Sequence, residues 1–419
     1  MVTCRATKSL VTLVVAGLVA AGCSSSSPSP SSGGSAAPAG LPAFYSVPAG
    51  VARDAPGTLL KYAAVPAPGV QSTAYRVMYV SSDVHDHAQA VTGIVYVPSA
   101  PPPAGGYDIV SWAHGTTGMA DRCAPSLDPS TAVEGSTAVL NQLLAHGWEV
   151  TASDYQGEGT PPHLLPYLVG SLSARNTIDI VRAAAHLPAA HAGTTYLVWG
   201  HSEGGQTAMF SWDIGPSYGA GLHLVGVVAG APPSQFAFIY NALLTSPFRF
   251  YLLMAAGGFN SAYGDRAAPL GAVLTAKGMS LLPELRKGCY SYLQATLDKY
   301  PLQQLVKGDP FKVPAWQKLL AANDPEDLNA PNGVPLLIYQ GGADEQIPVI
   351  STQILAAHLC GIGQDLERWI YPGRTHGSVI PVAAPDFVHW MADRFSGVAN
   401  PDPYYPTGQA DVQTTTCPE

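Results

Sequence analysis

From about residue 72 onward, short runs of β-branched or apolar residues alternate with segments in which apolar residues recur every three or four positions. This alternation predicts an α/β fold, in which helices cover a mostly parallel sheet. Residues 74–80 and 91–97 are expected to pair as strands around the polar turn at 81–87. Further strands are expected at residues 107–113, 148–152, 194–198, 223–231, 334–340 and 366–371, the last two being the final strands of the chain.

Helical spacing is clear in two of the intervening segments. One is formed by Val139, Leu140, Leu143 and Leu144, and Gly147 is expected to stop it. The other contains Ala174, Ile178, Val181 and Ala185.

The segment from residue 232 to 332 has helical pieces but no strand rhythm, and it is longer than an ordinary connection in a compact domain. The chain length of 419 residues allows either two domains or one large domain with an insertion. We therefore expect one domain, residues 41–419, that carries an inserted helical cap at about 233–332.

Composition narrows the class of protein. A hydrophobic content of 47% supports a sizeable core, and 38 Pro and 43 Gly indicate many shaped loops. The formal net charge is −9 and no dense run of Lys and Arg occurs. These features argue against a nucleic-acid partner.

The N-terminus has the pattern of an export signal, residues 1–22. Arg5 and Lys8 supply positive charge, and the apolar stretch 10–21 is too short to span a bilayer. Small residues precede Cys23 as in a bacterial lipobox, which predicts acylation of Cys23 and anchoring to the outer face of the cell membrane, with plain secretion as the alternative. Removal of the two cations makes the mature charge −9 − 2 = −11. Residues 23–40, rich in Ser, Pro, Gly and Ala, are expected to form a flexible tether.

Four cysteines remain once the one in the signal and Cys23 are set aside: Cys123, Cys289, Cys360 and Cys417. In an oxidising compartment they are expected to form two disulfides. The sequence alone permits three pairings.

The strongest chemical signal is Gly200-His201-Ser202-Glu203-Gly204, a G-x-S-x-G pattern between an apolar strand and an expected helix. The glycines allow a sharp turn and a close approach of strand and helix, which exposes the serine hydroxyl. Ser202 is therefore the candidate nucleophile. The alternative is an ordinary glycine-rich turn.

A serine hydroxyl needs a base that is itself held in position. His376 is the candidate because it follows the last expected strand, whereas His201 is expected to point elsewhere and His358 and His389 fall on expected helices. The alternative for His376 is a surface loop residue.

The acid should lie between the serine and the histidine, and Asp344 follows the penultimate expected strand there. Glu345 is the neighbouring rival, and Asp324 and Asp327 in the cap are poorer candidates. The alternative for Asp344 is a capping or turn role.

An oxyanion hole needs backbone donors near the nucleophile. The strand at 107–113 runs into His114-Gly115-Thr116, so the N–H groups of Thr116 and Glu203 are the candidates, with Gly115 as the register alternative. His114 is interpreted as a structural hydrogen-bonding residue.

Two other features have plain explanations. His85-Asp86-His87 has no further metal ligands in view and is interpreted as an exposed hairpin turn, so no metal site is expected. The apolar side chains Phe248, Phe250, Tyr251, Leu252, Leu253 and Met254 are interpreted as a buried cap helix that also forms a wall for an acyl chain.

Taken together, these motifs resemble the secretory lipase family, which includes lipases of the lipase A type and actinobacterial relatives. The resemblance covers nearly the whole mature chain and rests on these segments: residues 112–118, 154–159, 167–170 with 174–176, the 200–204 elbow, and 341–348.

The resemblance implies an α/β-hydrolase fold with a helical cap, a lipid or ester substrate, and no cofactor. It also implies the disulfides Cys123–Cys289 and Cys360–Cys417. Glu203 departs from the family pattern, since relatives often have Gln there, and this puts the charge of the pocket in doubt.

The expected activity is that of a secreted lipase or carboxylesterase, which cleaves acylglycerols and other esters through an acyl-enzyme. A serine peptidase or polyester hydrolase on the same fold is one alternative. A lipid-anchored binding protein without turnover is the other.

Overall fold

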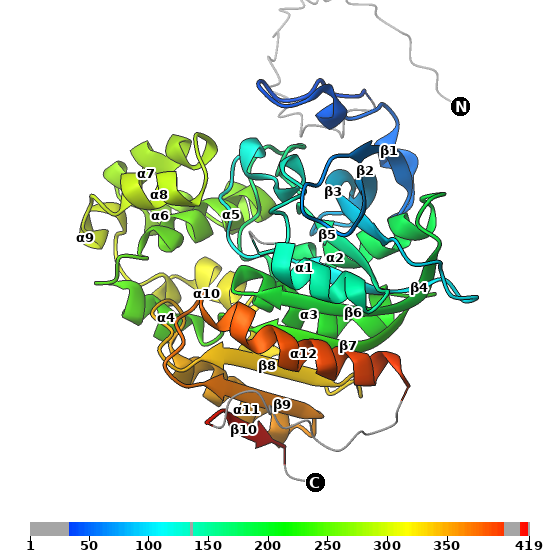
Figure 1. Ribbon diagram of the computed structural model, residues 1–419. Coiled ribbons are helices and arrows are strands. Elements are labelled where there is room, and N and C mark those ends of the chain that lie inside the picture. The colour runs from blue at the N-terminus through cyan, green and yellow to red at the C-terminus, as the bar shows by residue number, and fades with distance from the viewer. Residues whose placement is uncertain (1–32, 135–136, 398–410, 418–419) are drawn as a thin grey trace, which may run out of the picture. The chain divides into compact units, whose positions relative to one another are not determined.

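A ten-stranded sheet runs through the part of the chain that the computed structural model describes, residues 33–134, 137–397 and 411–417 (Figure 1). Its strands lie in the order β1-β2-β3-β5-β4-β6-β7-β8-β9-β10. Their bounds are β1 Leu59–Val65, β2 Ser72–Ser82, β3 Ala88–Pro98, β4 Tyr107–Ala113, β5 Glu149–Ser153, β6 Ala192–His201, β7 His223–Gly230, β8 Leu336–Gly341, β9 Leu366–Tyr371 and β10 Gln413–Thr416.

The central strands, from β5 through β4, β6, β7 and β8 to β9, are parallel to one another. The strands at both edges pair antiparallel, β1 with β2, β2 with β3, β3 with β5 and β10 with β9. Parallel neighbours need crossover connections, which here contain helices. The predicted α/β fold with a mostly parallel sheet is therefore confirmed.

Helices cover both faces of the sheet. Successive strand residues point to opposite faces, so Trp199 packs with α1 and α12 while Val198 packs with α2, α3 and α11. The helices are α1 Thr137–Ala145, α2 Gly170–Ala185, α3 Glu203–Tyr218, α4 Phe236–Leu243, α5 Phe250–Ala267, α6 Leu270–Val273, α7 Ala276–Leu281, α8 Tyr290–Leu297, α9 Leu302–Leu305, α10 Pro314–Ala321, α11 Val349–Gly361 and α12 Val379–Phe395.

Two edge strands differ from the sequence prediction. The prediction that residues 366–371 form the final strand is wrong, because Gln413–Thr416 pairs antiparallel with β9. This strand is short and polar, and it therefore has no apolar alternation to detect. The prediction also lacked β1, which lies at the opposite edge and is only partly buried.

The chain between β7 and β8 forms a helical insertion, residues 231–335, that contains α4 to α10. Figure 1 shows these helices gathered at the left of the view. They share an apolar core with the segments that follow β4 and β5, and Phe250, Leu253 and Phe259 are almost completely buried in it. Among the described residues, no helix is both long enough and apolar enough to cross a membrane.

Two disulfides fix segments that are distant in the sequence. Cys123 is bonded to Cys289 with the Cα atoms 5.5 Å apart, and Cys360 to Cys417 with the Cα atoms 5.0 Å apart. These are the pairings that the family resemblance implied. The first joins the insertion to the loop after β4, and the second joins α11 to the residue that follows β10.

The expected signal segment 1–22 and the acylation site Cys23 lie outside the described residues. Of the expected tether, residues 33–40 are described. Within it, Ser35 exchanges two backbone hydrogen bonds with Val47, at 2.9 and 2.8 Å. The last part of this segment is thus paired with the beginning of the expected domain.

Candidate active site

Ser202 lies at a sharp turn between β6 and α3. Its backbone has φ 60° and ψ −122°, a left-handed conformation that is strained for a residue with a side chain. The Ser202 N–H donates to the carbonyl oxygen of Gly230 in the neighbouring strand at 2.9 Å. This is the geometry of a nucleophile elbow, in which the serine side chain stands at the top of the sheet.

The glycines of the elbow are required by close backbone contacts. A Cβ atom on Gly200 would lie 2.1 Å from the Gly204 carbonyl oxygen, and one on Gly204 would lie 1.9 Å from the Ala113 carbonyl oxygen. Any side chain at these positions would push β6, α3 and β4 apart. The pattern in the sequence therefore reflects packing at the turn.

His376 and Asp344 meet beside this elbow, from the loops after β9 and β8. His376 Nδ1 lies 2.9 Å from Asp344 Oδ2, and the two side chains are 7% and 0% exposed. Asp344 Oδ1 also accepts backbone N–H groups from Gln346 and Ile347, each at 2.9 Å. Because a carboxylate only accepts, Nδ1 carries the proton and Nε2 is left as the basic nitrogen.

Electrostatics favours the ionised form of Asp344. Burial alone would raise the pKa of this carboxyl group, but the hydrogen bond and charge of His376, with the two backbone N–H groups, lower the pKa below its ordinary value. The side chain is therefore suited to orient the imidazole and to stabilise its cation.

The rival acids make different contacts. Glu345 is exposed, and its carboxylate accepts the backbone N–H of His376 at 3.1 Å rather than the ring. Asp324 accepts the backbone N–H groups of Gln235 and Phe236 at 2.9 and 2.6 Å, where α4 begins. Neither carboxylate has a hydrogen bond to the His376 ring.

His201 does not point away from the site, so this part of the prediction is wrong. Its buried ring lies 4.6 Å from the His376 ring, centroid to centroid, and 5.7 Å from Tyr339. It is the last residue of β6, directly before Ser202. Burial, reinforced by the nearby His376, lowers the pKa of His201 well below its ordinary value, so the ring is neutral.

Ser202 and His376 line the same cavity, which has a volume of about 470 Å³. Gly115 and Thr116, from the loop after β4, line it as well. The carboxyl ends of four parallel strands thus supply the residues of this site, which is where α/β sheets place ligands.

Of the candidate oxyanion donors, Thr116 lines the cavity together with Ser202, and Glu203 follows Ser202 in the chain. A Cβ atom on Gly115 would lie 3.7 Å from the Ser202 Cβ, so the loop after β4 runs close to the elbow. The Thr116 hydroxyl is 3.0 Å from the Tyr167 hydroxyl. Glu203 is the first residue of α3, where N–H groups have no acceptor within the helix.

The Glu203 side chain is buried, with 2% exposed. Burial, opposed by the charge of His114 and reinforced by Glu158, raises the pKa of Glu203 to about 8. The carboxyl group is therefore mostly neutral at pH 7. In its neutral form the acid matches in charge the Gln that relatives often have at this position.

Glu134 is a residue of the cavity that no sequence motif identified. Glu134 lines the cavity that Ser202 and His376 share. Burial, opposed by His376 and His114, raises the pKa of Glu134 to about 7. It lies in an irregular segment before α1, and no motif marks it.

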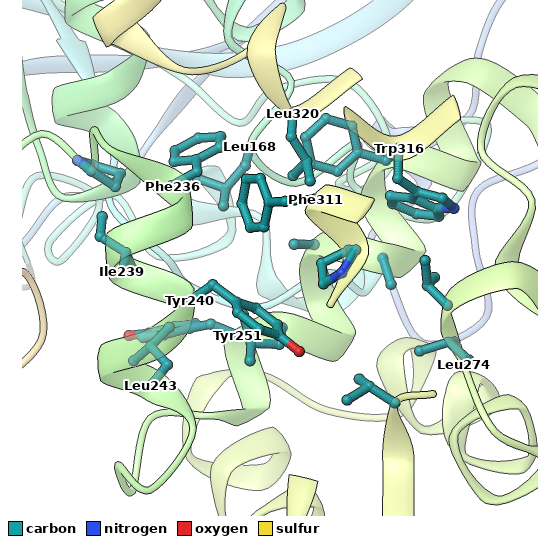
Figure 2. A pocket seen from close by; sticks show the side chains of 18 of the residues that line it. Leu168, Phe236, Ile239, Tyr240, Leu243, Tyr251, Leu274, Phe311, Trp316 and Leu320 are labelled. Carbon is teal, nitrogen blue, oxygen red and sulfur yellow. The ribbon is translucent and has the colours of Figure 1, made fainter. Parts of the chain in front are cut away.

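The insertion contains a second, apolar cavity (Figure 2). Side chains of α4, α5 and α10 line it, together with Phe311 from the turn between α9 and α10. Tyr251 lines both this cavity and the cavity of Ser202, and its hydroxyl donates to Gln346 Oε1 at 2.8 Å. The residues labelled in Figure 2 are Leu168, Phe236, Ile239, Tyr240, Leu243, Tyr251, Leu274, Phe311, Trp316 and Leu320.

Only part of the apolar run 248–254 lines this cavity. Tyr251 and Leu252 do so, whereas Phe250, Leu253 and Met254 belong to the core of the insertion. The expectation that the whole run forms one wall is therefore wrong. A helix that is apolar all round has only one face toward any cavity.

The His85-Asp86-His87 segment forms the turn between β2 and β3, as expected. Asp86 pairs with Arg175 at 2.7 Å, and His87 with Asp83 at 3.2 Å. Within residues 33–134, 137–397 and 411–417, no group of three or more His, Cys, Asp or Glu side chains has the arrangement of a metal site.

Comparison with known proteins adds to this geometry. The family model described as Secretory lipase matches residues 125–402. Lipase 10 of Candida albicans is 25% identical over 389 residues, which cover 84% of this chain and 80% of that protein. A Mycobacterium tuberculosis relative, named Probable inactive lipase MT1628, is 24% identical over 384 residues, 84% of this chain and 82% of that protein.

Solved structures show the same fold. Candida antarctica lipase A in its closed state has a TM-score of 0.71 at 20% identity, and the alignment covers 87% of each chain. A rice cell wall degrading esterase, LipA from Xanthomonas oryzae, has a TM-score of 0.67 at 18% identity over 82% of this chain and 99% of that chain.

Proposed function

Because this chain belongs to the secretory lipase family, we propose that it is a serine hydrolase that cleaves carboxylic esters, acylglycerols among them, with Ser202, His376 and Asp344 as its triad. The observation that carries the proposal is the 2.9 Å hydrogen bond between His376 Nδ1 and Asp344 Oδ2. It lies beside the cavity that His376 shares with the strained serine.

In the first half of the proposed reaction, Ser202 Oγ attacks the ester carbonyl carbon and its proton passes to His376 Nε2. The negative oxygen of the tetrahedral intermediate accepts the N–H groups of Thr116 and Glu203. When the intermediate collapses, the carbon–alkoxide bond breaks and His376 returns the proton to the leaving oxygen. The alcohol leaves and the acyl group stays on Ser202.

In the second half, a water molecule attacks the acyl-enzyme. His376 removes its proton, the same oxyanion site stabilises the second intermediate, and the Ser202 oxygen leaves with the proton from His376. The carboxylic acid is released, and no cofactor enters either half.

The apolar cavity of the insertion is the proposed site of the acyl chain. Tyr251 lines it and the cavity of Ser202, and the lining residues Phe236, Ile239 and Leu252 are apolar. Each methylene that leaves water contributes about 0.8 kcal/mol at most. Medium and long acyl esters should therefore have a higher kcat/KM than acetate.

Export is part of the proposal. The family is a secretory one, and the expected signal 1–22 with acylation at Cys23 would anchor the domain to the outer face of the membrane through the 23–40 tether. An anchored enzyme would meet its ester substrates at that surface.

The competing hypothesis is a binding protein that keeps the fold without turnover. The M. tuberculosis relative is named a probable inactive lipase. A fluorophosphonate probe and p-nitrophenyl butyrate distinguish the two. We expect labelling of Ser202 in the wild type, and a loss of about 10⁴- to 10⁶-fold in kcat for Ser202→Ala.

The matched control is Ser211→Ala, in the same helix, whose hydroxyl donates to the Thr207 carbonyl oxygen at 2.8 Å. It should keep its activity. A wild type that neither labels nor hydrolyses esters would exclude the enzyme, and more than about a tenth of the activity in Ser202→Ala would exclude this nucleophile.

A further inference from the structure

A buried carboxylate that the proposed reaction does not use lies against the loop after β4. Glu158 is fully buried, in the loop that follows β5. Its Oε1 accepts a hydrogen bond from the Thr117 hydroxyl at 2.8 Å, and its Oε2 lies 3.3 Å from His114 Nε2. The two contacts fall on either side of Thr116, the proposed oxyanion donor.

The contacts of His114 favour its positively charged form. Its Nδ1 lies 2.7 Å from the Gly115 carbonyl oxygen, which only accepts, so Nδ1 carries a proton while Nε2 faces the Glu158 carboxylate. Burial alone would lower the pKa of His114, but the charge of Glu158 raises it to about 9. An ion pair inside the protein is only weakly screened, and it therefore restrains both partners.

The loop that carries Glu158 is itself held firmly. Tyr155 has φ 60° and stacks on the His114 ring with the centroids 4.1 Å apart. Its hydroxyl donates to the His114 carbonyl oxygen at 3.1 Å. Gly157 has φ +93°, and a Cβ atom there would lie 2.6 Å from the Leu164 carbonyl oxygen. Glu158 therefore extends from a backbone with little freedom to move.

We infer, on the basis of the proposed function, that Glu158 is a positioning residue for the oxyanion hole, acting through His114 and Thr117. It fixes the backbone on both sides of Thr116, so that the Thr116 N–H is in place before charge develops on the substrate oxygen. Preorganised donors stabilise a transition state more than a ground state. Loss of Glu158 should therefore lower kcat and leave KM nearly unchanged.

Glu158→Gln is the test, because an amide oxygen still accepts from Thr117 but offers no charge to His114. We expect kcat to fall about 10- to 100-fold, with KM within about 2-fold. The affinity for a trifluoromethyl ketone, whose adduct with serine places an oxyanion in the hole, should fall by a similar factor. The affinity for a long-chain alcohol, which has no carbonyl, should not change.

Two further variants separate positioning from general stability. Thr117→Val removes only the hydroxyl contact to Glu158, so it should lower kcat by a smaller factor than Glu158→Gln does. Asp179→Asn is the matched control, because Asp179 is also fully buried, accepts the Ser81 hydroxyl at 2.7 Å and faces Arg182. It should lower stability and leave kcat and ketone affinity unchanged.

The inference is overturned if the wild type hydrolyses esters and Glu158→Gln keeps its kcat. It is also overturned if ketone and alcohol affinities fall together with stability, since that would indicate a merely structural role. Failure of the wild type to hydrolyse esters would instead reject the proposed function.

Discussion

Replacing Glu203 by Gln tests whether a neutral acid sits next to Ser202. The pKa of Glu203 is about 8 in the folded protein, against an ordinary value of 4.5. Between these two pH values the unfolded chain releases the proton while the folded chain keeps it. The folded state binds more protons there, so the free energy of unfolding falls as the pH rises, and the fall ends above pH 8.

The two pKa values set the size of this effect. Their difference is 8 − 4.5 = 3.5, which corresponds to about 5 kcal/mol when the group is fully ionised. The loss of stability is about 1 kcal/mol at pH 5, about 3 kcal/mol at pH 7 and close to 5 kcal/mol above pH 9. Gln does not ionise, so Glu203→Gln lacks this dependence.

The assay is urea unfolding of both proteins at pH 5, 7 and 9, followed by circular dichroism. The substitution also changes the free energy of unfolding by an amount that does not depend on pH, and other groups titrate in both proteins. The informative quantity is therefore the difference in free energy of unfolding between variant and wild type, followed as a function of pH. We expect the variant to gain about 4 kcal/mol relative to wild type from pH 5 to pH 9. Parallel curves would refute the reasoning, because Glu203 would then be ionised throughout.

Three other outcomes follow from the site. Asp344→Asn should lower kcat about 10⁴-fold because it disturbs the His376 tautomer, whereas Glu345→Gln should stay within about 3-fold; steady-state kinetics with p-nitrophenyl butyrate decides, and the reverse order would move the acid to Glu345. Tyr251→Ala should raise the ratio of kcat/KM for palmitate over butyrate esters, because it removes a ring that lines both cavities; an unchanged ratio would place the acyl chain elsewhere. Cys23→Ala should abolish acylation and release the protein from membranes, which mass spectrometry of the N-terminus and fractionation measure; an unmodified N-terminus in the native protein would contradict anchoring.

Backbone requirements made much of the fold predictable. The elbow has a recognisable sequence because Gly200 and Gly204 have no room for a side chain. The buried parallel strands have apolar runs because helices cover both faces of the sheet. The position of Asp344 after β8 and of His376 after β9 follows from the order of strands along the chain.

The side chains that surround Ser202, Asp344 and His376 are brought there by tertiary contacts, which a local sequence pattern does not reveal. Glu134, Tyr251 and Gln346 reach the site from three separate segments. The apolar run 248–254 is spread around a helix, and only the packing of the insertion decides which face lines a cavity. The polar edge strand β10 has no hydrophobic signal and depends on pairing with β9.

The Cys123–Cys289 disulfide limits how the insertion can move relative to the loop after β4. Cys289 lies just before α8, its neighbour Tyr290 donates a backbone hydrogen bond to the Thr117 carbonyl oxygen at 2.7 Å, and Cys289 also pairs with Gly118. The insertion is thus attached to the same loop that contains Thr116. If the insertion rotated as one rigid body about its ends at β7 and β8, it would displace this loop and move the Thr116 N–H away from Ser202. Movement of the insertion that leaves this donor loop in place is therefore confined to helices far from Cys289, with α8 held at the loop.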